Sequence, residues 1–217
     1  GVCDELPYAT TDPACQEAAR AAADLLASLG HEVDQGHPEP MDRLDFMYDY
    51  IRVIRASLVA EMRDLVPAIG RPWAADDVED GTWVNYQRGL KISAPDYLAS
   101  RERLHAFTRA MLAWWQGGHD ILVTPTVATP PPALGHLVEG DERELTRRLA
   151  AVTPFVPQFN VTGQPAISLP LHWDDDGLPI GVQLVAAPGR EDLLVRLASQ
   201  LEAAAPWHHR QPQLTCA

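Results

Sequence analysis

The sequence lacks the excess of positive charge and the long apolar stretches that several common functions require. It has 217 residues with 17 lysine and arginine side chains against 30 carboxylates, which gives a net charge of −13. A surface of this sign repels phosphate groups and anionic lipid, so we expect neither nucleic acid nor a membrane surface as a partner. No apolar run approaches the ~20 residues needed to cross a bilayer.

Motifs for metals and cofactors are also missing. The cysteines Cys3, Cys15 and Cys216 have neither zinc-like nor disulfide-like spacing, and the adjacent His208 and His209 diverge on most backbones. No glycine-rich phosphate loop is present. We therefore expect no metal and no cofactor. Because no basic start followed by an apolar signal segment is seen, we expect a reducing, cytoplasmic location.

An activated nucleophile is not recognisable either. The pattern Gly-x-Ser-x-Gly is absent, and the six serines fall in expected helices, caps or strands. Cys3 and Cys15 have no neighbouring base or cation in the sequence, which favours buried thiols over reactive ones. The residues alone therefore predict a domain that does not assemble its own active site.

What is present is a regular alternation of strands and helices. Two short apolar runs, Pro165–Leu171 and Pro179–Val185, are joined by a polar stretch that ends in Asp176-Gly177, a pair typical of hairpin turns. Both runs are apolar at nearly every position, which predicts strands buried on both faces under layers of helix or loop. A third buried strand is expected at Asp120–Thr124, before the proline-rich loop Pro125–Pro132. The fold class predicted is α/β, with a mixed β-sheet covered by helices.

Apolar spacing and capping residues predict helices in five segments, Pro13–Leu29, 44–69, Ser93–Gln116, Asp141–Ala151 and Glu191–Ala205. The tail 206–217 is expected to be loose. The acidic segment Trp73–Gly89 lacks the oxygen-ligand pattern of a calcium loop and is interpreted as a mobile surface loop. The second helix has mixed charges on its polar side, which we interpret as a solvated face; they are Asp45, Asp49, Arg52, Arg55 and Arg63.

Four blocks together resemble a known family. Asn160–Pro170 matches Asn-x-x-Gly-x-Pro-Ala-x-x-x-Pro, and Gly177–Val185 begins with Gly-Leu-Pro-x-Gly-x-Gln. Asp120–Thr126 matches Asp-x-Leu-x-x-Pro-Thr, and Leu29–Val33 matches Leu-Gly-x-x-Val. In their order along the chain, from Leu29–Val33 to Gly177–Val185, the blocks resemble the C-terminal part of the amidase signature family, the serine amidohydrolases. The likeness covers nearly the whole chain, so residues 1–217 are interpreted as the C-terminal part of a single amidase domain.

The resemblance implies a chemistry whose catalytic groups this chain does not hold. The family uses a lysine, a bridging serine in a cis peptide and a nucleophilic serine, all within a signature that precedes the matched blocks. Here no Gly-Gly-Ser-Ser-Gly-Gly occurs, no two serines are adjacent, and the only lysine is Lys91. The implied function is therefore that of a C-terminal fragment, inactive alone, of an enzyme that hydrolyses linear amides to a carboxylate and ammonia or an amine. Its expected partners are a small-molecule amide and the missing N-terminal half of the same protein. Whether it also forms a homo-oligomer stays open.

The resemblance also implies which residues face the substrate, and none of them is catalytic. Side chains just before and within the Asn-x-x-Gly block should form a wall of the acyl pocket together with the end of the third strand. They are Thr153, Phe155, Val156, Phe159, Asn160, Thr124 and Pro125. Plain packing is an equally good interpretation, because apolar residues line pockets and cores alike.

Two other functions stay open. The chain could be a non-catalytic binding or structural module, or a fragment of an amidotransferase A-like subunit. That subunit has an acidic residue at about the place of Thr153, and its absence here argues against this subfamily. An apolar pocket wall favours a neutral or hydrophobic acyl group.

Overall fold

The computed structural model describes residues 1–210, and its contacts divide the chain into two units. The sheet unit comprises Gly1–Asp42 and the chain from Met111 onward, whereas the helical unit comprises Arg43–Ala110. No helix among the described residues is long and apolar enough to cross a membrane.

The sheet unit contains three antiparallel strands, β1 (Ile121–Pro125), β2 (Ala166–Trp173) and β3 (Pro179–Ala186), in the order β1-β3-β2. Gly177 has φ +80° in the turn that joins β2 to β3, so the expected hairpin is confirmed. Val2 adds parallel bridges to Val123 and Gln35, which makes the pairing mixed, as predicted.

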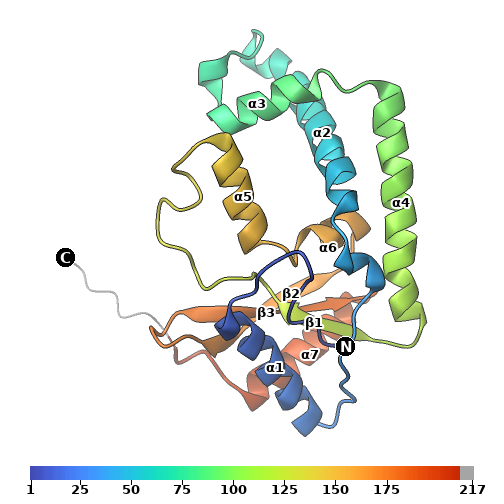
Figure 1. The fold of residues 1–217 in the computed structure, drawn as a ribbon, viewed down its shortest axis with the longest axis vertical. Coiled ribbons are helices and arrows are strands. Elements are labelled where there is room, and N and C mark those ends of the chain that lie inside the picture. The colour runs from blue at the N-terminus through green and yellow to red at the C-terminus, as the bar shows by residue number, and fades with distance from the viewer. Residues whose placement is uncertain (211–217) are drawn as a thin grey trace, which may run out of the picture. The chain divides into compact units, whose positions relative to one another are not determined.

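Five helices lie wholly or partly in the sheet unit. Asp12 accepts a hydrogen bond from the Ala14 backbone N–H and begins α1 (Pro13–Ser28), close to the predicted bounds. The others are α5 (Glu142–Val152), α6 (Pro157–Thr162), α7 (Glu191–Ala204) and the end of α4 (Ala94–Gln116), with a short 3₁₀ turn at Glu39–Asp42. Figure 1 shows α1 and α7 on one side of the sheet and α5 and α6 on the other. The sequence did not predict α6.

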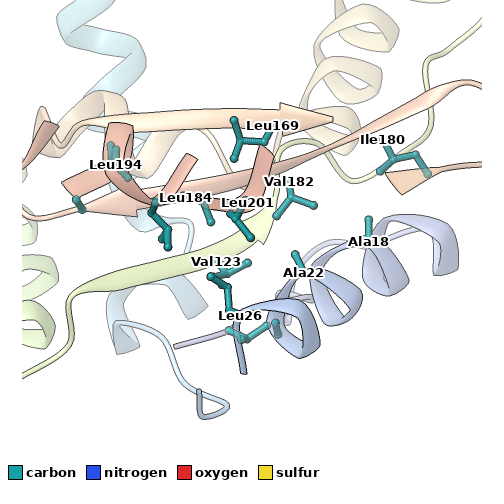
Figure 2. Close-up of a cluster of buried hydrophobic side chains, with 14 of the residues drawn as sticks. Ala18, Ala22, Leu26, Val123, Leu169, Ile180, Val182, Leu184, Leu194 and Leu201 are labelled. Carbon is teal, nitrogen blue, oxygen red and sulfur yellow. The ribbon is translucent and has the colours of Figure 1, made fainter. Parts of the chain in front are cut away.

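The face of the sheet toward α1 and α7, the apolar face, is the core of the unit. Val123, Val182 and Leu184 project from the strands and pack with aliphatic side chains of both helices (Figure 2). The alanines of α1 are short, which allows the helix backbone to approach the strands closely. The residues at the centre of this cluster are Ala18, Ala22, Leu26, Val123, Leu169, Ile180, Val182, Leu184, Leu194, Leu197 and Leu201.

The opposite face, the polar face, is only partly covered. The prediction that both hairpin strands are buried on both faces is right for β3, which is buried at six of its eight positions. It is wrong for β2, where Ala166 and Ser168 are exposed. The physical reason is position: β2 lies at an edge of the described sheet with β3 as its only strand neighbour there, whereas β1 at the other edge is also bridged by Val2.

The helical unit consists of α2 (Asp45–Ile69), a 3₁₀ turn (Ala75–Asp77), α3 (Asp80–Gly89) and the first part of α4. The expected loop at Trp73–Gly89 is therefore wrong, because most of it is helical. The Trp73 indole N–H donates to the Met62 carbonyl at 2.6 Å, which holds this segment against α2.

The interpretation of α2's charges as a solvated face is wrong at Asp49. This carboxylate is only 6% exposed and accepts from Arg103 Nε (2.7 Å) and Nη2 (2.6 Å). The Arg103 hydrogen bond is the main reason that the pKa of Asp49 lies below its usual value. Arg55 is also tied down, since its Nε donates to Asn85 Oδ1 at 2.9 Å.

The tail is ordered at its start. Trp207 packs against the apolar core, and the Arg210 guanidinium lies 3.9 Å from the centre of the Trp173 ring. Of the segment expected to be loose, 211–217 lies outside the described residues.

Candidate functional site

A row of polar side chains crosses the polar face of the sheet. Thr124 on β1 lies opposite Gln183 on β3, and Gln183 lies opposite Ser168 on β2. Directly opposed side chains share one face of a sheet, so the three lie side by side among aliphatic neighbours. This row is the main interruption of the apolar pattern in the strands.

Gln183 connects the row to the segment that precedes α6. Its side chain is 6% exposed, and its Nε2 donates to Thr124 Oγ1 and to the Phe155 carbonyl oxygen, both at 3.1 Å. The Thr124 hydroxyl in turn donates to the Pro125 carbonyl at 2.8 Å. Buried polar groups are tolerated when they are hydrogen-bonded in this way. The buried amide therefore fixes the backbone at Phe155 over the polar face.

A second buried amide holds the same segment from its other side. Gln158 is fully buried, and its Nε2 donates to the Pro154 carbonyl at 2.7 Å and to the Tyr8 hydroxyl at 2.9 Å. Burial raises the pKa of Tyr8 to about 12, so this hydroxyl stays protonated at neutral pH. Gln183 thus ties the segment 154–158 to β3, and Gln158 ties it to Tyr8.

The Asn160–Pro170 block has a local structural explanation. Gly163 ends α6 in a left-handed conformation with φ +67°, which a side chain would disfavour. Gln164 follows, and its Nε2 donates to the Ala186 carbonyl at 2.9 Å while its Oε1 accepts from the Thr162 hydroxyl at 3.0 Å. The block therefore ends a short helix, anchors it to β3 and starts β2.

The structure joins Thr124 to the Phe155 backbone through Gln183, whereas Pro125 lies opposite Val182 of the apolar face, and the seven predicted residues differ in exposure. Thr124 and Phe155 are fully buried within the chain, Phe159 is 4% exposed and Pro125 is buried. Thr153 and Val156 are half-buried, and Asn160 is exposed. The three partly or fully exposed residues are the ones that can reach a ligand in this conformation. The role of all seven as a pocket wall stays a prediction.

Sequence reasoning missed a pair of hydroxyls at the open end of the row. Thr126 Oγ1 and Ser168 Oγ lie 2.6 Å apart above the backbone of Gly181. A Cβ at position 181 would lie 2.7 Å from both oxygens. A glycine inside an aliphatic strand is the sequence signal for such a close approach, and it could have pointed to this place.

A cavity of about 640 Å³ lies at the other end of β1. Its lining includes Asp34, Asp120 and His119, whose Nε2 is 3.6 Å from Asp34 Oδ2 and whose ring stacks on Trp114. None of the residues predicted to face the substrate lines this cavity, which lies at the end where β1 begins. We therefore place the candidate site at the carboxyl end of β1, on the polar face.

The described residues support binding at this site better than catalysis. Burial raises the pKa of Cys3 to about 12 and of Cys15 to about 11, which removes both thiols as nucleophiles near neutral pH. Ser168 is hydrogen-bonded to a hydroxyl and not to a base. Within residues 1–210, no three His, Cys, Asp or Glu side chains gather in a way that could hold a metal ion, and Cys216 lies outside that range.

Comparison with known proteins identifies a family. A family model described as Amidase matches residues 1–195. Among curated proteins, the 6-aminohexanoate-cyclic-dimer hydrolases of Pseudomonas sp. (strain NK87) and Paenarthrobacter ureafaciens are each 40% identical over 210 residues, covering 94% of this chain and 43% of the relative. The putative amidase AmiC of Mycobacterium tuberculosis is 36% identical over 188 residues, covering 85% of this chain and 38% of the relative.

Solved structures give the same result. The structure of a 6-aminohexanoate cyclic dimer hydrolase superposes with a TM-score of 0.90 at 38% identity, covering 98% of this chain and 46% of that protein. A bacterial aryl acylamidase of the amidase signature family, 20% identical with a TM-score of 0.72, shows that the fold is shared more widely. The chain spans less than half the length of these relatives.

Proposed function

The chain belongs to the amidase family, and we propose that it forms the acyl-pocket part of an amide hydrolase. The observation that supports this most strongly is the superposition over 98% of the chain, at 38% identity, on a cyclic dimer hydrolase. The polar face adds a structural reason, because buried glutamines fix the backbone of the segment from which most of the proposed pocket wall comes.

The catalytic groups are proposed to come from sequence outside this chain. The relatives are more than twice as long as the match, and the residues described here supply no activated nucleophile. By resemblance to the family, a serine oxygen attacks the amide carbonyl carbon, the C–N bond breaks, and the nitrogen leaves with a proton as ammonia or an amine. Water then cleaves the acyl ester to a carboxylate and restores the serine. This route consumes only water and the amide.

For the substrate we propose an amide of an ω-amino acid, with the cyclic dimer of 6-aminohexanoate as the first candidate. Two relatives at 40% identity are named as hydrolases of that dimer. Of the predicted wall, the half-buried Val156 offers an aliphatic surface that suits a neutral chain of methylenes, while Phe155 and Phe159 are buried within this chain. Linear amides, expected from the sequence alone, are the second candidate.

The experiment is a hydrolysis assay of the full-length product of the gene that encodes these residues. Release of free amine from the cyclic dimer, the linear dimer and hexanamide is measured against the chain of 217 residues alone. We expect turnover by the full-length protein, with preference for the cyclic dimer, and none by the chain alone. A full-length protein that is folded and cleaves none of the three would contradict the proposal and favour a non-catalytic module.

A further inference from the structure

We propose that the Thr126 and Ser168 hydroxyls form a substrate-binding pair that donates one hydrogen bond to the carbonyl oxygen of a second, non-reacting amide in the substrate. This inference rests on the proposed function and adds to it a residue-level determinant of specificity. It predicts that the enzyme distinguishes diamides from monoamides through these two side chains.

The first observation is the close approach of the two hydroxyls. Their oxygens are 2.6 Å apart, and both would lie 2.7 Å from a Cβ at position 181. Gly181 is not among the glycines with positive φ, so its backbone does not require glycine. The requirement at position 181 is space above the strand, and the two hydroxyls occupy that space.

The second observation is an unused hydrogen-bond donor. Each hydroxyl has one proton, and one of the two protons is used within the pair. Within residues 1–210, neither oxygen makes any other hydrogen bond. Ser168 is exposed and Thr126 is half-buried, so the remaining O–H can reach a ligand from the open side of the sheet.

The third observation is position relative to the predicted pocket wall. Ser168 lies directly opposite Gln183, whose amide holds the Phe155 carbonyl and Thr124. Thr126 follows β1 at its carboxyl end, where its N–H donates to the Gly181 carbonyl at 2.9 Å. The pair therefore continues the polar row from the segment 153–160 toward open solvent.

The chemistry of the pair selects the kind of group that binds. Within residues 1–210, neither hydroxyl is hydrogen-bonded to a charged side chain that could offset the charge of an ionised ligand group. A single neutral donor beside aliphatic side chains suits a carbonyl oxygen. A substrate with two amides provides one carbonyl for the reaction and a second one, several methylenes away, for this pair.

The test compares the full-length enzyme with variants on a diamide and on a monoamide of similar chain length. Thr126→Val and Ser168→Ala each remove one hydroxyl with little change in volume, and Gly181→Ala forces the two oxygens apart. We expect Ser168→Ala and Gly181→Ala to raise KM for the 6-aminohexanoate cyclic dimer roughly five- to ten-fold, the effect of one lost neutral hydrogen bond, and Thr126→Val to raise it less, because Ser168 keeps its own proton. KM and kcat for hexanamide should stay within about two-fold.

Two controls separate binding from folding. Thr126→Ser keeps the hydroxyl and should restore a KM close to that of the wild type, and Ser199→Ala removes an exposed hydroxyl on α7 without effect. The double variant T126V/S168A should be no worse than the poorer single variant, because both hydroxyls serve one hydrogen bond. Thermal unfolding of every variant is measured alongside.

The outcomes distinguish the inference from the function on which it rests. An equal rise in KM for diamide and monoamide, or no rise for either, would overturn the proposed role of the hydroxyl pair and leave the proposed amide hydrolysis intact. If the wild type cleaves no amide, the proposed function fails. Calorimetric binding of the cyclic dimer then decides the inference, with weaker binding by S168A supporting it and unchanged binding refuting it.

Discussion

The two faces of the same three strands differ in what they do for the molecule. On the apolar face, Val123, Val182 and Leu184 pack against α1 and α7 and have no polar neighbours in the cluster. On the polar face, the alternating positions Thr124 and Gln183 form hydrogen bonds that reach out of the sheet to Phe155. Because successive residues of a strand point to opposite sides, one short sequence encodes both surfaces.

The difference between the two faces separates the residues that stabilise the fold from those that position the site. Burying aliphatic side chains contributes stability roughly in proportion to the area removed from water. A buried amide contributes little net stability even when its bonds are satisfied, since it exchanges water for protein partners. Gln183 is therefore better understood as the residue that holds the segment 153–160 in place.

The largest expected effect is on the apolar face. Leu184→Ala should lower the free energy of unfolding by about 2–5 kcal/mol, because the fully buried side chain leaves a cavity between the strands and the helices. Denaturant unfolding measures this loss, with Val195→Ala on the exposed side of α7 as the matched control. A loss below about 1 kcal/mol would show that this face is not the core.

An intermediate effect is expected from the polar face. Gln183→Leu keeps the size of the side chain but leaves the Phe155 carbonyl and the Thr124 hydroxyl without a donor, a cost of about 1–3 kcal/mol. In the full-length enzyme we also expect a higher KM for amides, because the segment 153–160 is no longer fixed. Gln200→Leu, which removes only an exposed hydrogen bond to His31, is the control for kinetics and unfolding. Unchanged KM with lowered stability would reduce Gln183 to a packing residue.

The smallest effect on stability is expected from Ser168→Cys, whose thiol should differ sharply from that of Cys15 in its rate of alkylation. In a Cys216→Ser background, Ser168→Cys should change stability by less than about 0.5 kcal/mol. Its thiol should react with iodoacetamide increasingly fast between pH 7 and pH 9, because an exposed thiol ionises near pH 8.5. Cys15, with its pKa raised to about 11 by burial on the apolar face, should stay unmodified over this range.

Mass spectrometry of the labelled peptides measures both rates in one sample. Fast labelling of Cys15 in the folded protein would show that the apolar face opens. Protection of the introduced thiol at position 168 in the 217-residue chain would show that the polar face is covered.

Much of the fold could be predicted because its signals are local. Asp12-Pro13 and Gly30 bracket α1, and Asp176-Gly177 marks the hairpin turn. The short α6 was missed because its six residues, Pro157–Thr162, give too few turns for a helical period to be visible.

The features that the sequence did not predict depend on contacts between residues that are far apart in the sequence. Asp49 is buried and hydrogen-bonded to Arg103, which lies 54 residues later in the sequence. The Thr126–Ser168 contact joins residues 42 positions apart, and its trace in the sequence is a glycine on a third segment. The location of the pocket wall came from family resemblance, while its anchoring by Gln158 and Gln183 could be seen only in the structure.

The central claim is that substrate binds on the polar face of the sheet, and protection of position 168 from alkylation tests it most directly. In the full-length enzyme carrying Ser168→Cys, alkylation of the introduced thiol is timed with and without saturating 6-aminohexanoate cyclic dimer, and Ser199→Cys on α7 serves as the reference site. If substrate binds on the polar face, we expect the dimer to slow alkylation at position 168 at least several-fold and to leave the rate at position 199 unchanged. Equal labelling rates at position 168 with and without the dimer, in an enzyme that still cleaves it, would contradict the account.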